Sequence, residues 1–376
     1  MRIEAPVPAD VLEAIRAPFL AAGARTLDAP ILQPLGLFLD VAGESLRERL
    51  FVVATDSGEE SCLRPDFTVP ALMAHIADGA VQGRYVYEGH AFRVAPAGTG
   101  RAEEFLQIGL EAFETADAAE ADGEIAALAW RAAAAGGRGD LTMLLGDAGL
   151  FAAFVEALAI GPAKAARLKR AFPSPRRLAA ELADDRAAGP SGAGRLARLL
   201  AGLGEGEAAE VLEEIWALAG IEPVGGRPPG EIVRRLAQRS EAASGPPLDG
   251  ERRELIGAFL AIADEPRAAL AAVAALGGAE RPALARALRD WDRRLAAFAA
   301  AGIPTPALRF SAAFGRAFGY YDGPLFEVRS EALGEDQPVA AGGRYDGLPA
   351  RLGAVAASGA VGCMVRPGRA WIGGRP

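Results

Sequence analysis

Four short segments of the 376-residue sequence carry side chains able to bind a small polar ligand. In the first, Leu63–Thr68, Asp66 and Thr68 are two residues apart, so in an extended chain both would face the same pocket. A strand-to-helix junction with Asp66 or Thr68 as the helix N-cap explains the same residues equally well. Pro65 restricts the backbone in either case.

The second segment, Tyr85–Phe113, has the pattern of two strands joined by a loop rich in proline and glycine. The strand period of two places Gln107, Gly109 and Glu111 on one face. A glycine between two polar side chains would leave room above the sheet for a small ligand. A face that simply contacts water explains the same pattern, and this segment alone favours that explanation.

The third segment, Phe314–Glu327, sets an arginine and a tyrosine pair among glycines. Arg316 offers a partner for an anion, and Tyr320 and Tyr321 offer hydroxyl groups at their ring edges. The alternative is a tyrosine pair that belongs only to the core and a turn. The fourth segment, Gly342–Leu348, has a glycine pair that allows a tight loop and an Asp-Gly pair typical of a turn.

Strand and helix patterns surround these segments. Val7–Phe19 predicts an opening helix, and Arg49–Val53 and Ser61–Arg64 predict a hairpin around an Asp-Ser-Gly turn. Further strand patterns follow at Ala307–Phe310, Leu325–Val328 and Gly359–Val365. We therefore expect an α+β fold, an antiparallel sheet flanked by helices.

The middle of the chain differs in composition. Residues from about 146 to 303 are Ala, Leu, Arg and Glu at helical spacing, broken by Gly/Pro loops. The clearest helix has five apolar residues on one face, with Gly302 placed to end it: Leu284, Leu288, Trp291, Leu295 and Phe298. The sequence thus predicts a core domain of residues 1–145 and 304–376 and a helical insertion of residues 146–303.

Composition argues against several classes of protein. A hydrophobic content of 51% with 24% charged residues is typical of a globular chain, and the net charge of −9 disfavours a nucleic-acid partner. Two cysteines and two histidines are too few for a disulfide framework or a metal site. The acidic N-terminus and the broken apolar stretches predict neither a signal peptide nor a membrane span, and hence a cytoplasmic protein.

Together, the four segments resemble the catalytic domain of histidyl-tRNA synthetase, which has the class II aminoacyl-tRNA synthetase fold. The resemblance runs through residues 25–145 and 306–366 in the family's order. The family's Leu-Arg-Pro-Glu-x-Thr is similar to Leu63–Thr68, with Asp66 in place of Glu, and its motif 2 arginine is similar to Arg93. Its Gln-x-Gly-x-Glu, Arg-Gly-Leu-Asp-Tyr-Tyr and Gly-Gly-Arg-Tyr-Asp-Gly-Leu motifs are similar to Gln107–Glu111, Arg316–Tyr321 and Gly342–Leu348.

The sequence departs from the synthetase pattern where that family binds ATP. Ala95 stands where the family has a glutamate, two residues after the motif 2 arginine. Motif 3 continues in the family as Gly-Leu-Glu-Arg, whereas Arg366–Arg369 reads Arg-Pro-Gly-Arg, and Pro367 disfavours helical geometry at Arg366. The sequence also ends at Pro376, so no anticodon-binding domain is expected. We expect adenylation and tRNA binding to be lost.

A synthetase-like sequence that keeps the amino-acid pocket but lacks the ATP and tRNA signatures resembles the family of ATP phosphoribosyltransferase regulatory subunits. Membership implies a non-catalytic chain required by a short catalytic subunit for the first step of histidine biosynthesis, within a hetero-octamer, and involved in feedback by L-histidine. The resemblance also implies that Asp66 and Glu111 are anionic partners and that Arg316 pairs with the α-carboxylate. The implied histidine-binding residues are Asp66, Thr68, Arg93, Gln107, Glu111, Arg316, Tyr320, Tyr321 and Tyr345.

Two other functions stay open at this stage. A divergent, truncated aminoacyl transferase would still form an aminoacyl-adenylate, and ATP–pyrophosphate exchange with histidine would reveal it. A stand-alone histidine sensor would bind histidine without co-purifying with the phosphoribosyltransferase. For the regulatory subunit, no catalytic residue, metal ion or cofactor is expected in the chain itself.

Overall fold

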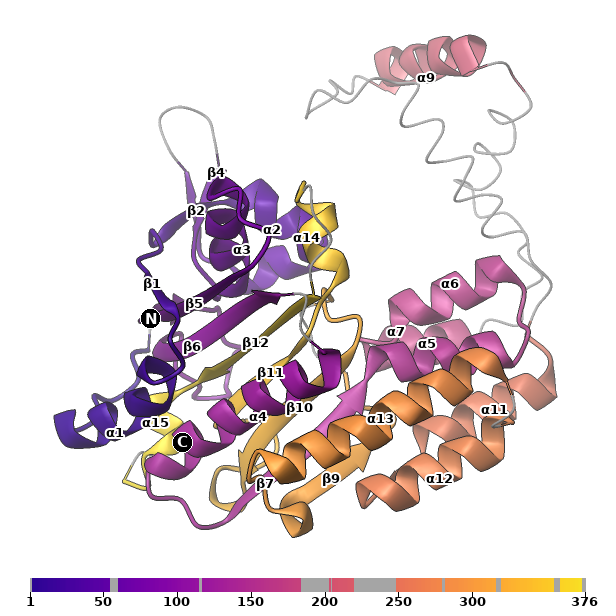
Figure 1. Cartoon of the computed structure of the whole chain (residues 1–376). Helices are drawn as coiled ribbons and strands as arrows, with labels where there is room; N and C mark the ends of the chain where they lie inside the picture. The colour runs from indigo at the N-terminus through magenta and orange to yellow at the C-terminus, as the bar shows by residue number, and fades with distance from the viewer. Residues whose placement is uncertain are drawn as a thin grey trace. The chain divides into compact units, whose positions relative to one another are not determined.

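The computed structural model describes residues 2–54, 60–114, 117–183, 203, 205–219, 248–278, 281–315, 319–354 and 359–373. The chain divides into two compact units (Figure 1). One comprises Met1–Phe154 and Ala258–Pro376, and the other comprises Val155–Gly257. The four segments with candidate ligand-binding residues all belong to the first unit.

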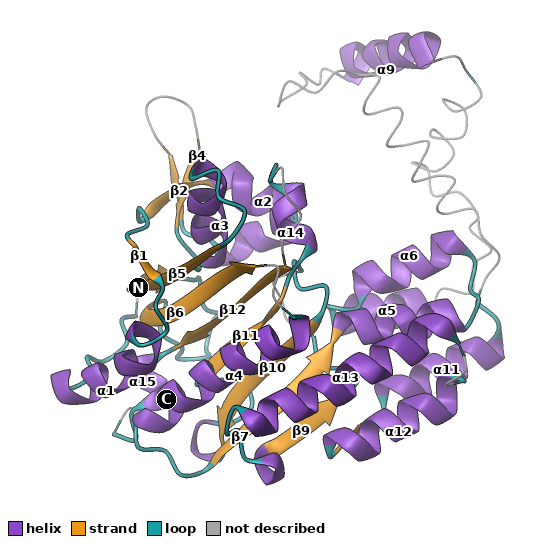
Figure 2. Ribbon diagram, in the orientation of Figure 1, coloured by secondary structure: helices purple, strands orange, loops and turns teal. Residues whose placement is uncertain are grey.

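The first unit is built on a large, mainly antiparallel sheet (Figure 2). Within the described residues it has nine strands in the order β1-β5-β6-β12-β11-β10-β7-β9-β8, of which only β1–β5 and β7–β9 pair in parallel. The strands are β1 (Arg25–Leu27), β5 (Gly83–Phe92), β6 (Glu104–Glu114), β7 (Leu141–Asp147), β8 (Ala263–Asp264), β9 (Leu308–Ser311), β10 (Pro324–Ser330), β11 (Ala340–Arg344) and β12 (Gly359–Val365). A small antiparallel sheet joins β2 (Leu32–Pro34), β4 (Glu60–Leu63) and β3 (Val52–Ala54). The predicted α+β class with an extended sheet flanked by helices is confirmed.

The helices of the first unit come from both of its chain segments. They are α1 (Ala9–Leu20), α2 (Leu35–Ala42), η1 (Glu44–Arg49), α3 (Thr68–Ala77), α4 (Ala118–Ala135), α12 (Pro266–Gly277), α13 (Pro282–Ala300), η2 (Thr305–Ala307), η3 (Glu331–Leu333), α14 (Gly347–Arg351) and α15 (Pro367–Ala370). The second unit contains α6 (Pro162–Ala171), α7 (Pro175–Ala183) and α9 (Glu205–Ala219), while α5 (Ala148–Ala157) and α11 (Gly250–Leu260) cross the boundaries. No helix in the described ranges is long and apolar enough to cross a membrane.

Helix α4 lies across one face of the central strands, against β10, β11 and β12 (Figures 1 and 2). Its alanines allow this close approach, because a small side chain lets a helix backbone lie near a sheet, and Ala126, Ala129 and Ala133 are fully buried. The side chain of Asp117 caps the helix by accepting the backbone N–H groups of Ala119 and Glu120. The opposite face of these strands is thereby left for the polar side chains described below.

The amphipathic helix predicted around Trp291 is α13, and it packs on α4. Its C-terminus has the geometry that the sequence predicts: Gly302 has a φ of +87°. The N–H of Gly302 bonds to the Ala299 carbonyl, and the N–H of Ile303 bonds to the Phe298 carbonyl, which is a Schellman cap. The apolar face is buried at Leu284, Trp291, Leu295 and Phe298.

The compact units differ in their bounds from the predicted domains. The second unit, Val155–Gly257, is shorter at both ends than the predicted insertion of residues 146–303. Helix α13 packs on α4, and Trp291 Nε1 donates to Asp147 Oδ2 at the end of β7, at 2.7 Å. These contacts bring the last part of the helical block into the core unit, which its amphipathic pattern alone does not reveal.

Several predicted local structures are present. The predicted hairpin strands pair antiparallel as β3 and β4, while its turn at residues 56–58 lies outside the described residues. Leu63–Thr68 is a strand-to-helix junction, but the N-cap of α3 is Phe67, without a side-chain bond, so neither Asp66 nor Thr68 caps the helix. The predicted tight loop at Gly342–Gly343 is wrong. Both residues belong to β11, where an added Cβ at Gly342 would overlap the Gly362 carbonyl of the neighbouring strand.

Candidate functional site

A small pocket lies over β5, β6, β11 and β12, next to the start of α3. We call it the polar pocket; its empty volume, including the mouth, is about 340 Å³. Its lining residues are Asp66, Thr68, Tyr87, Arg93, Gln107, Glu111, Tyr320, Tyr321, Ala341, Gly362, Cys363 and Met364. Strand pairing explains part of this set, since Glu111 of β6 lies opposite Gly362 of β12, and Tyr87 of β5 lies opposite Gly109 of β6. Segments distant in the sequence therefore converge on one sheet face.

Glu111 is the centre of a buried hydrogen-bond network. The Thr68 hydroxyl donates to Glu111 Oε1 at 2.8 Å, the Tyr87 hydroxyl lies 3.5 Å from the same oxygen, and the Tyr345 hydroxyl donates to Oε2. The side chain reaches over Gly362, where an added Cβ would overlap the carboxyl group. The carboxyl group therefore joins α3, β5, β6 and the residue after β11 through three hydroxyl groups.

Burial raises the pKa of Glu111 to about 8, even though the hydrogen bonds from Tyr345 and Thr68 lower it. The nearby Asp66 carboxylate contributes to this raised value. This raised pKa favours the protonated form of Glu111 at pH 7. For Glu111, the expectation of an anionic partner for an ammonium group is opposed by burial, which raises its pKa despite the three hydroxyl groups that favour the ionised form.

Gln107 is the second buried polar group of the pocket. Its side chain is 1% exposed, and within the described residues neither its amide oxygen nor its amide nitrogen has a hydrogen-bond partner. Leaving a buried amide without hydrogen bonds costs about 1–3 kcal/mol of stability. Proteins therefore retain such a group where another molecule supplies the missing hydrogen bonds. Gln107 can both donate to and accept from a ligand in the pocket.

The segment containing Asp66 is held rigidly beside the pocket. Arg64 donates through Nε to the His90 carbonyl at 2.7 Å and through Nη1 to the Ala29 carbonyl, and its guanidinium stacks on the Phe67 ring. Arg93 Nε donates to the Pro65 carbonyl at 2.8 Å. These bonds fix the backbone on both sides of Asp66, whose carboxylate therefore lines the pocket with little freedom to move.

The tyrosine pair closes another side of the pocket. The Tyr320 hydroxyl bonds to Thr68 Oγ1 at 3.4 Å, and the Tyr320 and Tyr321 rings lie 4.7 Å apart. The next residue, Asp322, accepts the backbone N–H groups of residues 346 and 347 at 3.0 and 2.6 Å. This carboxylate ties the tyrosine pair to the Gly-Gly-Arg-Tyr-Asp-Gly segment, and sequence reasoning gave it no role.

Tyr87 is one of five lining residues that the sequence analysis did not place in the site, with Ala341, Gly362, Cys363 and Met364. Its ring stacks on Phe67 with centroids 4.3 Å apart, and it lies opposite Gly109 in the β5–β6 register. An added Cβ at Gly109 would overlap the Tyr87 hydroxyl. The predicted ligand space above Gly109 is therefore filled by Tyr87. The signal available in the sequence was the pair Tyr85 and Tyr87 at strand spacing, facing the side that carries Glu111.

Arg344 of the glycine-rich motif holds β11 against the helices. Its Nε donates to Asp122 Oδ1 at 2.8 Å, while Arg294 Nε of α13 donates to Asp122 Oδ2 at 2.7 Å. All three side chains are buried. The buried Asp122 carboxylate thus links α4, α13 and β11, the strand that leads directly to Tyr345. Arg344 also pairs with Asp346 at 2.9 Å.

The structure gathers seven of the nine predicted residues around the polar pocket. They are Asp66, Thr68, Arg93, Gln107, Glu111, Tyr320 and Tyr321. Tyr345 contacts Glu111 but does not line the pocket. Arg316 lies outside the described residues.

Comparison with protein families places the chain in a known group. The family model of histidyl-tRNA synthetase matches residues 4–224 and 231–367. The ATP phosphoribosyltransferase regulatory subunit of Brucella anthropi is 35% identical over 350 residues, covering 92% of each chain. The protein of the same name from Mesorhizobium japonicum is 36% identical over 354 residues, also covering 92% of each chain.

Solved structures share the fold at lower identity. An ATP phosphoribosyltransferase regulatory subunit/histidyl-tRNA synthetase from Bacillus halodurans superposes with a TM-score of 0.65 at 19% identity, over 100% of this chain and 83% of that one. A histidyl-tRNA synthetase from Nostoc gives a TM-score of 0.60 at 16% identity, over 98% of this chain and 74% of that one. The class II synthetase-like fold is thereby confirmed, and the chain belongs to the family of ATP phosphoribosyltransferase regulatory subunits.

Proposed function

We propose that this chain regulates an ATP phosphoribosyltransferase by binding L-histidine in the polar pocket while a short catalytic partner subunit performs the reaction. The observation that carries this proposal is the buried Gln107 amide, which lacks a partner within the described residues and lies in the same pocket as Asp66. An amino acid supplies both hydrogen-bond donors and acceptors for such groups. The names of the curated relatives support the regulatory role.

The proposed contacts follow from the chemistry of each side chain. Asp66 pairs with the α-ammonium, because the raised pKa of Glu111 favours its protonated form, and Gln107 bonds to the ring or the carboxylate of the ligand. Tyr320 and Tyr321 reach the imidazole, and Arg93 and Arg316 attract the α-carboxylate. Hydrogen bonds to charged groups contribute about 1.5–3 kcal/mol each, so several of them together support micromolar binding.

A non-catalytic role is supported by the residues that follow β12. Arg366 has extended backbone angles, φ −102° and ψ 103°, as Pro367 demands. Its guanidinium carbon lies 3.8 Å from the centroid of the Phe105 ring, and its Nη2 pairs with Glu4 at 2.6 Å. Phe105 is itself only 2% exposed. A nucleotide base therefore has no free face of this ring on which to stack, which opposes adenylation in this chain.

Regulation then requires that histidine bind differently to the active and the inhibited assemblies. Only that difference in binding free energy, typically about 1–3 kcal/mol, can shift the equilibrium between the two assemblies and so change the activity of the catalytic subunit. The rigid attachments of the pocket, through Asp322 and Arg344, are the proposed route, because they join the tyrosine pair and β11 to the rest of the unit. We further propose that the complex is a cytoplasmic hetero-octamer without tRNA.

The test mixes the purified chain with a short-form ATP phosphoribosyltransferase and measures phosphoribosyl transfer with and without L-histidine. We expect transfer that depends on this chain and falls when histidine is added. Histidine-dependent ATP–pyrophosphate exchange by the chain alone would instead identify an adenylating enzyme. Histidine binding without any association with the catalytic chain would identify a stand-alone sensor.

A further inference from the structure

Asp147 stands at a buried junction where β7, α5 and α13 meet. Its side chain is almost completely buried, yet both carboxylate oxygens have N–H partners. Oδ1 accepts the backbone N–H of Gly149 in the first turn of α5 at 2.6 Å, and Oδ2 accepts Nε1 of Trp291 at 2.7 Å. These two bonds favour the ionised form, because a proton on either oxygen would compete with the N–H group that already points at it.

This junction adjoins the segment that carries the tyrosine pair of the polar pocket. Asp147 lies opposite Pro324 where β7 pairs with β10. The backbone N–H of Ala148 donates to the Gly323 carbonyl at 3.2 Å. The turn that Asp147 holds therefore sets the position of the residues that directly follow the tyrosine pair in the chain.

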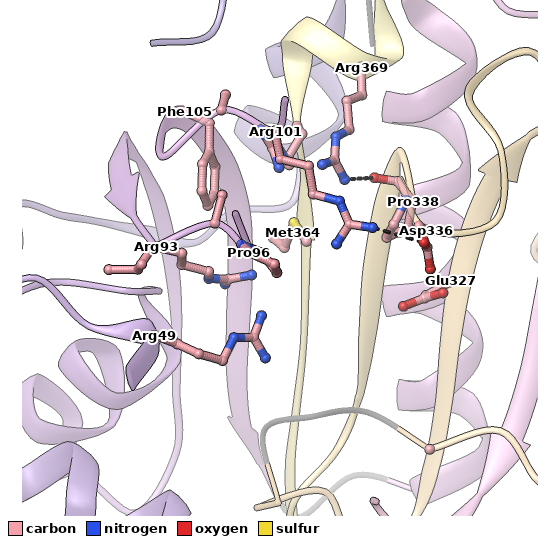
Figure 3. Close-up of a pocket in the computed structure, with 15 residues that line it drawn as sticks. Arg49, Arg93, Pro96, Arg101, Phe105, Glu327, Asp336, Pro338, Met364 and Arg369 are labelled. Carbon is pink, nitrogen blue, oxygen red and sulfur yellow. Dashed lines mark hydrogen bonds and ion pairs between the residues drawn. The ribbon is translucent and has the colours of Figure 1, made fainter. Parts of the chain in front are cut away.

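Strand β10 transmits the same position to the walls of the pocket. Glu327 of β10 lies opposite Ala341 of β11, and Ala341 lines the polar pocket. Glu327 is also in the wall of a larger pocket, which shares Arg93 and Met364 with the polar pocket (Figure 3). A shift of β10 at the Asp147 junction would thus move both the tyrosine pair and the wall formed by β11.

A small cavity gives the junction room to rearrange. Its empty volume, including the mouth, is about 240 Å³, and Trp291, Pro324 and Leu325 are among its lining residues. The Trp291 ring also packs edge-on against Phe310, with centroids 5.2 Å apart. Because close packing opposes movement only where atoms fill the space, loss of the bond to Asp147 would let the indole ring and Pro324 shift into this cavity.

The charge of Asp147 is finely balanced. Burial raises the pKa of its carboxyl group to about 6, although the positive charge of Arg294 and the N–H groups around it lower the pKa. Arg294 is the charged partner on α13, and it is itself paired with Asp122 of α4. On the tyrosine segment, burial also raises the pKa of Asp322. Asp147 therefore gains or loses its proton close to neutral pH.

We propose that Asp147 is a positioning residue for the polar pocket: its ionised carboxylate holds the tyrosine pair in the arrangement that binds histidine, and its protonation weakens that binding. The inference rests on the proposed function, because it concerns the affinity of the same pocket. It adds a dependence of histidine binding on pH that originates outside the pocket lining.

Asp147→Asn tests the proposal, because asparagine presents an NH₂ group where the protonated acid presents O–H and so imitates the protonated state at every pH. L-Histidine is titrated by calorimetry at pH 5.0 and 7.5 into the parent, Asp147→Asn and the control Asp292→Asn, whose carboxylate is exposed on α13. We expect Asp147→Asn to bind at least fivefold more weakly than the parent at pH 7.5 and within twofold of it at pH 5.0. The control should stay within twofold at both. Protonation of the free ligand is common to all three proteins and cancels in these ratios.

A ratio of affinities that does not change with pH, or equal affinities at pH 7.5, would overturn the proposal. Tryptophan fluorescence of the ligand-free chain gives a measurement that does not need histidine. Its emission should change with a midpoint near pH 6 in the parent and in Asp292→Asn, and this change should be absent in Trp291→Phe and Asp147→Asn.

The fluorescence measurement also separates the two proposals. A transition that persists in Asp147→Asn, or none in the parent, would overturn the role of Asp147 while leaving the proposed function standing. A parent that shows the transition but does not bind histidine would overturn the proposed function, and the dependence of histidine binding on Asp147 with it.

Discussion

Replacing Glu111 by glutamine tests the electrostatics at the centre of the polar pocket. The variant keeps the size of the side chain and an oxygen that accepts hydrogen bonds from the surrounding hydroxyl groups, but it cannot ionise. In the parent, burial raises the pKa of Glu111 from its ordinary value near 4.5 to about 8. The effect of Glu111→Gln on stability should therefore depend on pH.

The sign follows from proton linkage. Because the pKa of Glu111 is raised in the folded state, the stability from its bound proton is complete below the unfolded pKa and is lost as pH rises through 8. One pKa unit corresponds to about 1.4 kcal/mol, so the loss between pH 5 and pH 9 amounts to a few kcal/mol at most. The glutamine variant escapes this loss. It should be equal to or less stable than the parent at pH 5.5 and should gain on the parent by roughly 1–3 kcal/mol at pH 8.5.

Equilibrium unfolding in urea at pH 5.5, 7.0 and 8.5 measures this difference. Glu335→Gln, at an exposed carboxylate in the loop after η3, is the matched control and should show a constant difference from the parent. If the unfolding free energies of the parent and Glu111→Gln run parallel across this range, Glu111 is ionised in the folded protein and the reasoning is refuted.

Three further substitutions test other parts of the pocket. Gln107→Leu removes a buried amide that has no partners among the described residues, so urea unfolding should show unchanged or slightly higher stability. Calorimetry should show that the affinity for histidine falls at least tenfold. An affinity equal to that of the parent would contradict the site. Asp122→Asn leaves two buried arginines without their carboxylate and should cost about 3–5 kcal/mol of unfolding free energy, and a loss below about 1 kcal/mol would show that the network is dispensable. Gly362→Ala places a methyl group against Glu111 and should destabilise the fold by about 1–3 kcal/mol, whereas Gly36→Ala, in open space on α2, should not; similar thermal unfolding of the two would show that the strand can shift.

Local patterns in the sequence predicted much of the fold. The β5–β6 pair and the β3–β4 hairpin follow from alternation, and α13 with its glycine cap follows from helical spacing. The strand β11 did not follow, because Gly342 and Gly343 have no side chains to show a strand period, and their role is the close approach of neighbouring strands. The second compact unit is shorter than the predicted insertion for a related reason: an amphipathic helix shows that it packs, but not on which unit.

The candidate site was predictable where polar residues stand at unusual spacings, as with Asp66, Gln107 and Glu111. Tyr87 was missed because an aromatic residue at strand spacing is typical of a core. The raised pKa of Glu111 could not be predicted, since it depends on how far burial outweighs the opposite effect of hydroxyl groups from residues 68, 87 and 345, which only the tertiary structure brings together.

The most direct test of the account measures inhibition by L-histidine in the complex reconstituted with a short catalytic subunit. We compare the parent with Asp66→Asn, which keeps the shape of the side chain but removes the charge proposed to hold the ammonium group, and with Asp10→Asn at an exposed site of α1 as control. The account predicts that all three chains activate the partner and that Asp66→Asn alone needs at least tenfold more histidine for inhibition. Unchanged inhibition of the Asp66→Asn complex would contradict it.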